Sequence, residues 1–238
     1  MMKKSIVSVI IPTLNEEKYL EPTLKAVKNQ DYEGKCEVIV ADGNSKDNTV
    51  KIAKKYADKV IVVKKKGVSA GRNAGAKVAK GDILIFLDAD TIVLFNTLSE
   101  IVKAFKNKKV VGVACSVLPT SVKASDFAIY WLYNNFVKMS LKRKKPQVAG
   151  MCCVYSKKAF EKVGGFDEKL YVYEDLDLSA RIAKLGKIAF IENTLVLTSP
   201  RRFEAWGKTK AARKYIVTYL NYLLAGKKVP PNEYKPVR

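Results

Sequence analysis

The stretch Ile83 to Thr91, ILIFLDADT, is the part of this chain that decides its predicted fold. Ile83 to Leu87 form an unbroken apolar run of strand length, which is typical of a parallel strand covered on both faces. Asp88 and Asp90 follow it at once. Because ligands bind beyond the carboxyl ends of parallel strands, two acids here are well placed to hold a divalent cation against phosphate oxygens. The alternative is an ordinary turn, where Asp is common.

Strands and helices alternate along the chain around this stretch. We expect strands at 5–11, 37–41, 60–63, 83–87, 110–116, 147–155, 188–191 and 195–198. We expect helices ending near 29 and at 45–56, 69–80, 97–106, 157–163, 174–185 and 205–224, and a long amphipathic segment at 121–145. Ser45 is expected to cap the second helix. The alternation predicts βαβ units and therefore an α/β fold with a mostly parallel sheet flanked by helices.

The composition limits the class of protein. The 238 residues suit one α/β domain, and we find no internal repeat or dividing linker. A net charge of +21 favours polyanions, namely anionic membrane, nucleic acid or phosphorylated substrates, although a lysine-rich surface of the kind found in heat-adapted proteins is an alternative. No RNP, KH, zinc-finger or helix-turn-helix signature accompanies that charge, so we expect no nucleic acid partner.

The cysteines and the apolar runs indicate the cellular location of the protein. Cys36, Cys115, Cys152 and Cys153 form no CxxC pair and the chain has no His, so we expect reduced core thiols, no zinc site and a cytoplasmic location. The N-terminal apolar run is broken at Pro12 and is better explained as a first strand than as a signal peptide. Since no run approaches the roughly 20 apolar residues of a spanning helix, membrane contact would be peripheral.

Acids follow three predicted strands or loops: Asp42, the pair Asp88 and Asp90, and the pair Glu174 and Asp175. Together with their surroundings they resemble the family 2 glycosyltransferases, which have the GT-A fold and are inverting enzymes with a DxD motif. The matching stretches, in chain order between residues 5 and 187, are SVIIPTLNEEKYL, EVIVADGNSKDNT, SAGRNAGAKVAKGD, FLDAD, GGFDE and YEDLDLSARIAKLG. Each stretch is weak alone, but the ordered set is specific.

The resemblance implies a role for each matching residue on the donor side. The residues that it assigns to the nucleotide-sugar are Pro12, Thr13, Glu16, Asp42, Asn44, Arg72, Asp88, Ala89, Arg201 and Arg202. Asp90 is implied to bind Mg²⁺ or Mn²⁺, which would bridge the diphosphate. Arg201 and Arg202 match a QxxRW-type motif only loosely, and the late His ligand of many members is missing. Turn, capping or surface roles are the alternatives for Asp42, Arg72 and the two late arginines.

On the acceptor side, the resemblance implies that Asp175, in the pair with Glu174, is the general base. We expect the helix dipole to favour its ionised form, and the alternative is an ordinary acid at a helix N-terminus. Gly164, Gly165 and Phe166 are implied to line the acceptor side. The implied single GT-A domain, 1–238, then has a nucleotide-binding half at 1–116, an acceptor-binding half at 117–200, and a C-terminal helix and basic tail at 201–238.

The function implied by this resemblance is metal-dependent transfer of a sugar, from a UDP- or GDP-linked donor, to a hydroxyl of a glycan or lipid-linked acceptor. Transfer to a polyprenyl phosphate and non-enzymatic polyanion binding are the alternatives. Segment 121–145 has many aromatic residues ahead of Lys142, Arg143, Lys144 and Lys145. This pattern predicts a helix that lies on the inner face of an anionic membrane, and the alternative is a core helix.

Overall fold

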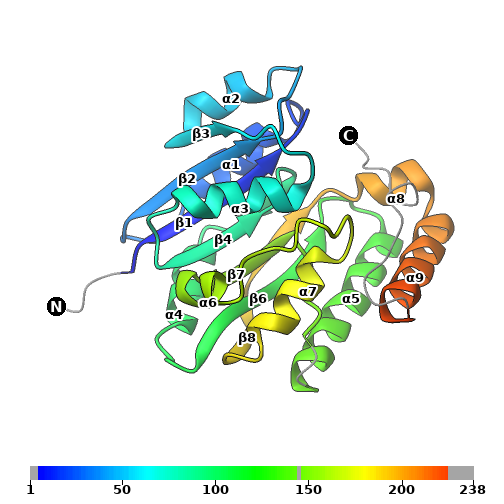
Figure 1. Cartoon of the computed structure of the whole chain (residues 1–238). Helices are drawn as coiled ribbons and strands as arrows, with labels where there is room; N and C mark the ends of the chain where they lie inside the picture. Colours follow the sequence, from blue (N-terminus) through cyan, green and yellow to red (C-terminus); the bar gives the residue numbers. More distant parts are fainter. Residues whose placement is uncertain (1–4, 144–145, 225–238) are drawn as a thin grey trace.

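The computed structural model describes residues 5–143 and 146–224. Within these ranges one sheet runs through the molecule in the order β3-β2-β1-β4-β7-β6-β8-β5, with helices on both faces (Figure 1). Its strands are β1 (Val7–Thr13), β2 (Cys36–Asp42), β3 (Lys59–Val62), β4 (Ile83–Leu87), β5 (Thr91–Val93), β6 (Val110–Pro119), β7 (Cys152–Ser156) and β8 (Lys187–Thr198). The helices are α1 (Leu20–Lys28), α2 (Thr49–Tyr56), α3 (Val68–Val78), α4 (Thr97–Ala104), α5 (Ala124–Lys142), α6 (Lys157–Lys162), α7 (Glu174–Ile182), α8 (Arg201–Trp206) and α9 (Lys208–Leu224).

The predicted α/β class with a mostly parallel sheet is confirmed. Strands β3, β2, β1 and β4 are parallel, and so are β6 and β8. Strand β7 runs antiparallel between β4 and β6. Its beginning therefore meets the end of β4, where the Asp88 amide donates a hydrogen bond to the Met151 carbonyl at 3.1 Å. This reversal brings the loop before β7 to the edge where the acids of β4 lie.

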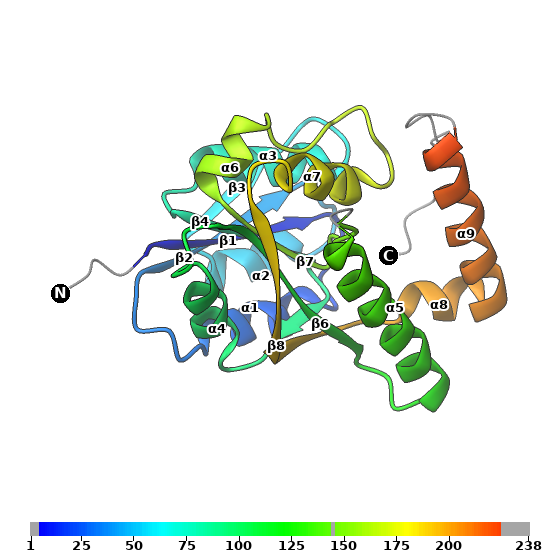
Figure 2. The ribbon, with the colours of Figure 1, turned by 90° about the horizontal axis from the view of Figure 1, so that it is seen from below.

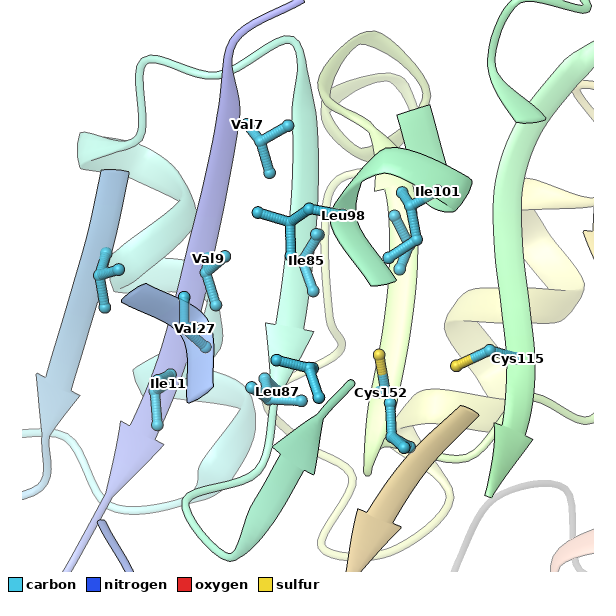
Figure 3. Close-up of a cluster of buried hydrophobic side chains, with 14 of the residues drawn as sticks. Val7, Val9, Ile11, Val27, Ile85, Leu87, Leu98, Ile101, Cys115 and Cys152 are labelled. Carbon is cyan, nitrogen blue, oxygen red and sulfur yellow. The ribbon is translucent and has the colours of Figure 1, made fainter. Parts of the chain in front are cut away.

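Two hydrophobic cores, one on each face of the sheet, explain why the strands lack alternation. In β4, Ile83, Ile85 and Leu87 face the core under α1, α2 and α4, whereas Leu84 and Phe86 face the core under α3, α6 and α7. Figure 2 shows these two groups of helices on opposite faces, and Figure 3 shows the first core. A strand covered on both sides has no polar face, so its sequence is apolar throughout.

One predicted helix cap was wrong. Helix α2 begins at Thr49 rather than at Ser45, and the Ser45 side chain binds Asp42 instead. The hydroxyl lies close to the end of β2, where it satisfies a buried carboxylate.

Several element boundaries also differ from prediction, because local patterns do not show where the sheet recruits a strand. Strand β7 begins at Cys152 rather than at 147, and β5 was not predicted. The two short strands after 187 are one strand, β8, with a register shift opposite Cys115 and Ser116. The last helix is two, α8 and α9, separated at Gly207, whose φ of 75° favours glycine.

The amphipathic segment forms α5, as predicted, while Lys144, Lys145 and the basic tail after Leu224 lie outside the described residues. Among the described helices none has the length and apolar character needed to cross a bilayer.

Candidate active site

The ends of β1 and β2 form a compact polar corner. Asp42 is fully buried; its Oδ1 accepts hydrogen bonds from the Thr13 hydroxyl at 3.0 Å and the Ser45 hydroxyl at 2.5 Å, and its Oδ2 accepts one from the Ser45 amide at 2.8 Å. Pro12 precedes Thr13 in β1, and Asn44 lies exposed on the next loop with a positive φ of 70°. The structure thus brings four of the predicted donor-side residues to one corner.

A second cluster joins the first loop to the end of the chain. The Arg201 guanidinium donates to both carboxylate oxygens of Glu16, at 2.7 and 3.0 Å, and its Nε lies 2.9 Å from Asp90 Oδ2. Its Cζ also lies 4.7 Å from the centroid of the Tyr19 ring. A small cavity of about 100 Å³ opens beside Asp90, lined in part by Tyr19, Thr23 and Ser199. Arg201 is therefore the cation that Asp90 contacts in this structure.

Arg72 forms the third cluster. Its side chain is buried and bonded to protein groups, so the alternative of a surface arginine is wrong, while contact with a nucleotide stays a prediction. The guanidinium donates to Glu174 Oε1 at 2.9 Å, Asp88 Oδ1 at 2.8 Å and the Gly150 carbonyl at 3.1 Å. The Phe166 ring lies below it, 5.1 Å from Cζ to centroid. Arg72 thus joins the acid after β4 to the start of α7.

Asp175 lies in the first turn of α7, next to this cluster. Its Oδ2 accepts a hydrogen bond from the Gly150 amide at 2.5 Å and its Oδ1 accepts one from the Leu176 amide at 2.8 Å. Tyr173, immediately before the helix, has a positive φ of 62°, which turns the chain sharply into α7. The carboxylate is held by backbone on two sides, and each oxygen keeps a lone pair for another donor.

The acids of this site have raised pKa values. Burial, helped by neighbouring Asp88, raises the pKa of Asp90 to about 6 although Arg201 opposes the shift. Burial also raises the pKa of Glu174, with Asp175 adding to the effect. The pKa of Asp175 is raised as well, by burial, against the opposing effects of Arg72 and the two backbone amides. The expectation that the helix N-terminus makes Asp175 a stronger acid is therefore wrong, because desolvation outweighs it.

Asp88 and Asp90 fit a hard divalent cation. A dication such as Mg²⁺ takes one or two carboxylates and completes its shell with water and substrate phosphates. No cluster of three or more His, Cys, Asp or Glu suited to a metal occurs among the described residues. The raised pKa of Asp90 reflects a buried carboxylate near a second one, an arrangement that a cation relieves.

The loop after α6 lies on the other side of Arg72. Asn73 holds it: its Oδ1 accepts from the Phe166 amide and its Nδ2 donates to the Phe166 carbonyl, both at 2.9 Å. Gly164, Gly165 and Phe166 line an open cavity of about 470 Å³. Asp175 is not among its lining residues, and the Phe166 ring is buried against Phe86 and Phe160. The ring thus supports Arg72, and the acceptor-side role of these three residues stays a prediction.

The remaining predicted residues lie around these clusters. Ala89, between the two acids, accepts a hydrogen bond on its carbonyl from the Thr23 hydroxyl at 2.8 Å, which ties the DAD turn to α1. The Arg202 Nη1 donates to the Tyr215 hydroxyl at 3.3 Å, and its charge also acts to lower the pKa of Asp90, which burial raises. The sequence did not indicate Gly150, which binds both Arg72 and Asp175 through its backbone. A glycine in an apolar stretch before a strand is a weak signal for such a role.

Comparisons with known proteins agree with this geometry. Residues 8–164 match the sequence profile described as "Glycosyl transferase family 2". The probable glycosyltransferase YdaM of Bacillus subtilis is 28% identical over 89% of this chain and 56% of its own, so the chain spans about half the length of that relative. Glycosyltransferase AglE of Haloferax volcanii is 40% identical over 35% of this chain and 30% of its own.

Solved structures share the fold. The mannosyltransferase PcManGT from Pyrobaculum calidifontis, in complex with GDP-Man and Mn²⁺, gives a TM-score of 0.70 at 23% identity, covering 94% of this chain and 66% of its own. TarS of Staphylococcus aureus, residues 1–349 in complex with UDP-GlcNAc, gives 0.68 at 18% identity, covering 95% and 68%. With the profile match spanning more than half of the sequence, this chain belongs to glycosyl transferase family 2 and has the GT-A fold.

Proposed function

We propose that this chain transfers a sugar, with inversion, from a nucleoside diphosphate sugar to a hydroxyl of an acceptor. The observation that carries the proposal is the Arg72 cluster. It connects Asp88, at the end of the strand that leads to the DAD turn, with Glu174, next to Asp175. These contacts support a single site in which donor-side acids and the acid of α7 act together, as a displacement between two substrates requires.

The corner of Thr13 and Asp42, with Glu16 nearby, would receive the nucleoside, since carboxylates accept hydrogen bonds from ribose hydroxyls and base N–H groups. Asp90 and Asp88 would face the diphosphate. Arg201 contributes a guanidinium fork of the kind that binds phosphate with two hydrogen bonds. The ligands of PcManGT and TarS, GDP-Man and UDP-GlcNAc, support a GDP- or UDP-linked donor.

Mg²⁺ or Mn²⁺, held by Asp90 with Asp88 nearby, would neutralise the charge that develops on the leaving nucleoside diphosphate. The metal of the PcManGT complex, Mn²⁺, supports this assignment. Arg201, which contacts Asp90, would pair with phosphate instead of this carboxylate when donor and cation bind.

Asp175 would act as the general base. The Gly150 and Leu176 amides fix its orientation, and its raised pKa makes it a stronger base than an exposed aspartate. It would accept the proton of the acceptor hydroxyl as that oxygen attacks the anomeric carbon. Glu174, buried and bonded to Arg72, would act as a positioning residue rather than as a second base.

A polyprenyl phosphate acceptor is the rival within this class. Such an acceptor is already an anion and needs no base, so the ordered Asp175 carboxylate favours a hydroxyl acceptor. A polyanion-binding protein without activity would not need acids at the strand ends, where they repel phosphate unless a cation intervenes.

The substitution Asp175→Asn tests the proposal. We expect transfer to fall by about 10²–10⁴-fold, because a general base of this kind contributes that much. Calorimetric titration with UDP or GDP in the presence of Mn²⁺ should give an unchanged affinity. In the parent protein the rate should fall as the pH drops through the raised pKa of Asp175, since the base must be deprotonated, and this acid limb should vanish in the variant.

Glu161→Gln, which removes an exposed acid on α6, is the matched control and should behave like the parent. Undiminished turnover in Asp175→Asn would reject the base assignment and favour an anionic acceptor. Absence of nucleotide binding with or without Mn²⁺ would reject the donor site.

A further inference from the structure

Large apolar side chains lie exposed at one end of the molecule. We define the α5–α9 surface as the eight exposed apolar residues of these two helices: Phe127, Trp131, Leu132, Phe136 and Met139 on α5, and Ile216, Val217 and Leu220 on α9. Soluble proteins expose such residues singly, whereas a contiguous group marks an interaction site.

The exposed apolar residues of α5 lie on the half of the helix opposite its buried residues. Phe127 and Trp131, four residues apart, share one direction, and Leu132 and Phe136, also four apart, share a second direction about 100° round the helix. The opposite face is buried, and there Asn134 anchors the helix by accepting from the Val117 amide at 2.9 Å and donating to the Val117 carbonyl at 2.8 Å. The outward face of α5 is therefore not part of the core, whereas its opposite face is.

The two helices form a common surface. The rings of Phe136 and Tyr219 meet edge to face, with centroids 6.5 Å apart, and Lys208 at the start of α9 pairs with Asp126 near the start of α5 at 2.6 Å. Figure 2 shows both helices at the side of the molecule away from β2 and the N-terminus.

Basic residues surround this apolar face. Lys123 precedes α5, Lys142 and Arg143 stand at its end, and Lys210 and Arg213 are exposed on α9. We propose that the α5–α9 surface docks on an anionic lipid membrane. Aromatic and aliphatic side chains enter the boundary between headgroups and acyl chains, and lysines and arginines at the same level attract anionic headgroups. A second copy of this chain, with a net charge of +21, would bring like charges together around the same patch.

The position of this surface also indicates the acceptor, an inference that rests on the proposed function. The Tyr133 hydroxyl of α5 accepts from the Ala149 amide at 3.2 Å, one residue before the glycine that binds Asp175. The Tyr173 hydroxyl, one residue before Glu174, donates to the Tyr215 carbonyl of α9 at 3.0 Å. Both docking helices thus hold the segments that carry the base. A membrane against them would present a lipid-linked glycan close to Asp175.

Vesicle co-sedimentation tests the proposal independently of activity. The parent protein should sediment with vesicles rich in phosphatidylglycerol at about 0.05 M salt, be released at about 0.5 M, and bind phosphatidylcholine vesicles far more weakly. The double variant Trp131→Ser/Leu132→Ser should lose about tenfold or more in vesicle affinity, and so should Lys142→Glu/Arg143→Glu.

Matched controls lie on the rest of the surface. Phe95 and Val62 are as exposed as the two residues changed in the test variant: they are 62% and 59% exposed, against 64% for Trp131 and 61% for Leu132. The double variant Phe95→Ser/Val62→Ser should therefore sediment like the parent. Lys54→Glu/Lys55→Glu on α2 controls for net charge. Trp131 also supplies a direct signal: in a Trp206→Phe background it is the one tryptophan left, and its emission should shift to the blue on vesicle binding.

Several results would overturn the membrane assignment. These are no sedimentation at low salt, equal losses in the surface and control variants, or a dimer on gel filtration that the Trp131→Ser/Leu132→Ser change dissolves. Normal vesicle binding in a protein that does not bind UDP or GDP would keep the docking surface and reject the proposed transfer and its lipid-linked acceptor.

Discussion

Two arginines bridge acids in this molecule, and the comparison between them explains how the site is built. The Arg72 side chain is 2% exposed and joins Asp88 to Glu174, whereas the Arg201 side chain is 18% exposed and joins Asp90 to Glu16. Asp88 and Asp90 are two residues apart on one turn, yet each contacts a different arginine. The buried arginine is part of the framework, and the more exposed one is the arginine that we propose to bind the phosphates of the donor.

The difference follows from desolvation. A fully buried guanidinium is stable only with its partners in place, and removing one partner of such a pair leaves an uncompensated charge. The Arg201 side chain is more exposed, so water can replace part of what it gives its partners and its loss should cost less. Three substitutions use this contrast, from the largest expected effect to the smallest.

Arg72→Met should destabilise the protein by about 3–5 kcal/mol, because the buried Glu174 would lose its cation. Arg201→Met, the comparison, should cost less, about 1–3 kcal/mol, because water reaches the Arg201 side chain although Glu16 and Asp90 are largely buried. Urea denaturation of both variants measures the difference. Equal free energies of unfolding for the Arg72→Met and Arg201→Met variants would show that the greater burial of Arg72 does not make it more important for stability.

Gly150→Ala should cost about 1–3 kcal/mol. A Cβ at this position would lie 2.4 Å from Arg72 Nη2, so either the guanidinium or the loop before β7 must move. Because the same glycine binds Asp175 through its amide, turnover should fall more than nucleotide affinity. Gly164→Ala is a useful comparison: no atom lies within 4 Å of its added Cβ, although its positive φ of 78° brings backbone strain. Loss of stability without loss of turnover in Gly150→Ala would separate Gly150 from catalysis.

Arg201→Gln should change ligand binding more than stability. Without the guanidinium, Asp90 is open to a cation, so Mn²⁺ alone should bind more tightly, whereas UDP or GDP with Mn²⁺ should bind about tenfold more weakly because one charged phosphate partner is lost. Titration calorimetry measures both. The same change at Arg202, whose guanidinium donates to the Tyr215 hydroxyl, should change both affinities by less than Arg201→Gln does. Parallel losses in the two variants would contradict a specific exchange at Arg201.

Much of the fold could be predicted from local patterns. The apolar run ILIFL predicts a buried strand, and helices do cover both faces of this strand in the structure. The spacing of such runs predicts the mostly parallel sheet. The prediction failed where long-range pairing decides the outcome. Strand β5 consists of three residues that pair with the distant β8, and α8 and α9 are separated at a single glycine, Gly207.

The candidate site shows the same division. Acids at strand ends are visible in the chain because each follows an apolar run. The pKa of Asp175 was predicted in the wrong direction, since helix position is local but desolvation depends on everything that packs around the carboxylate. A surface position stayed open as the alternative for Arg72, because a sequence does not show which arginines are buried.

The order of residues along this chain was enough to predict the α/β architecture, the family resemblance and the strand-end acids. These features depend on neighbours in the sequence or on position along a strand. Which arginine holds which acid depended on the folded chain, because the partners are far apart: 102 residues separate Arg72 from Glu174, and 185 separate Arg201 from Glu16. Charge pairing is decided by distance and burial in three dimensions, and neither quantity is present in the sequence.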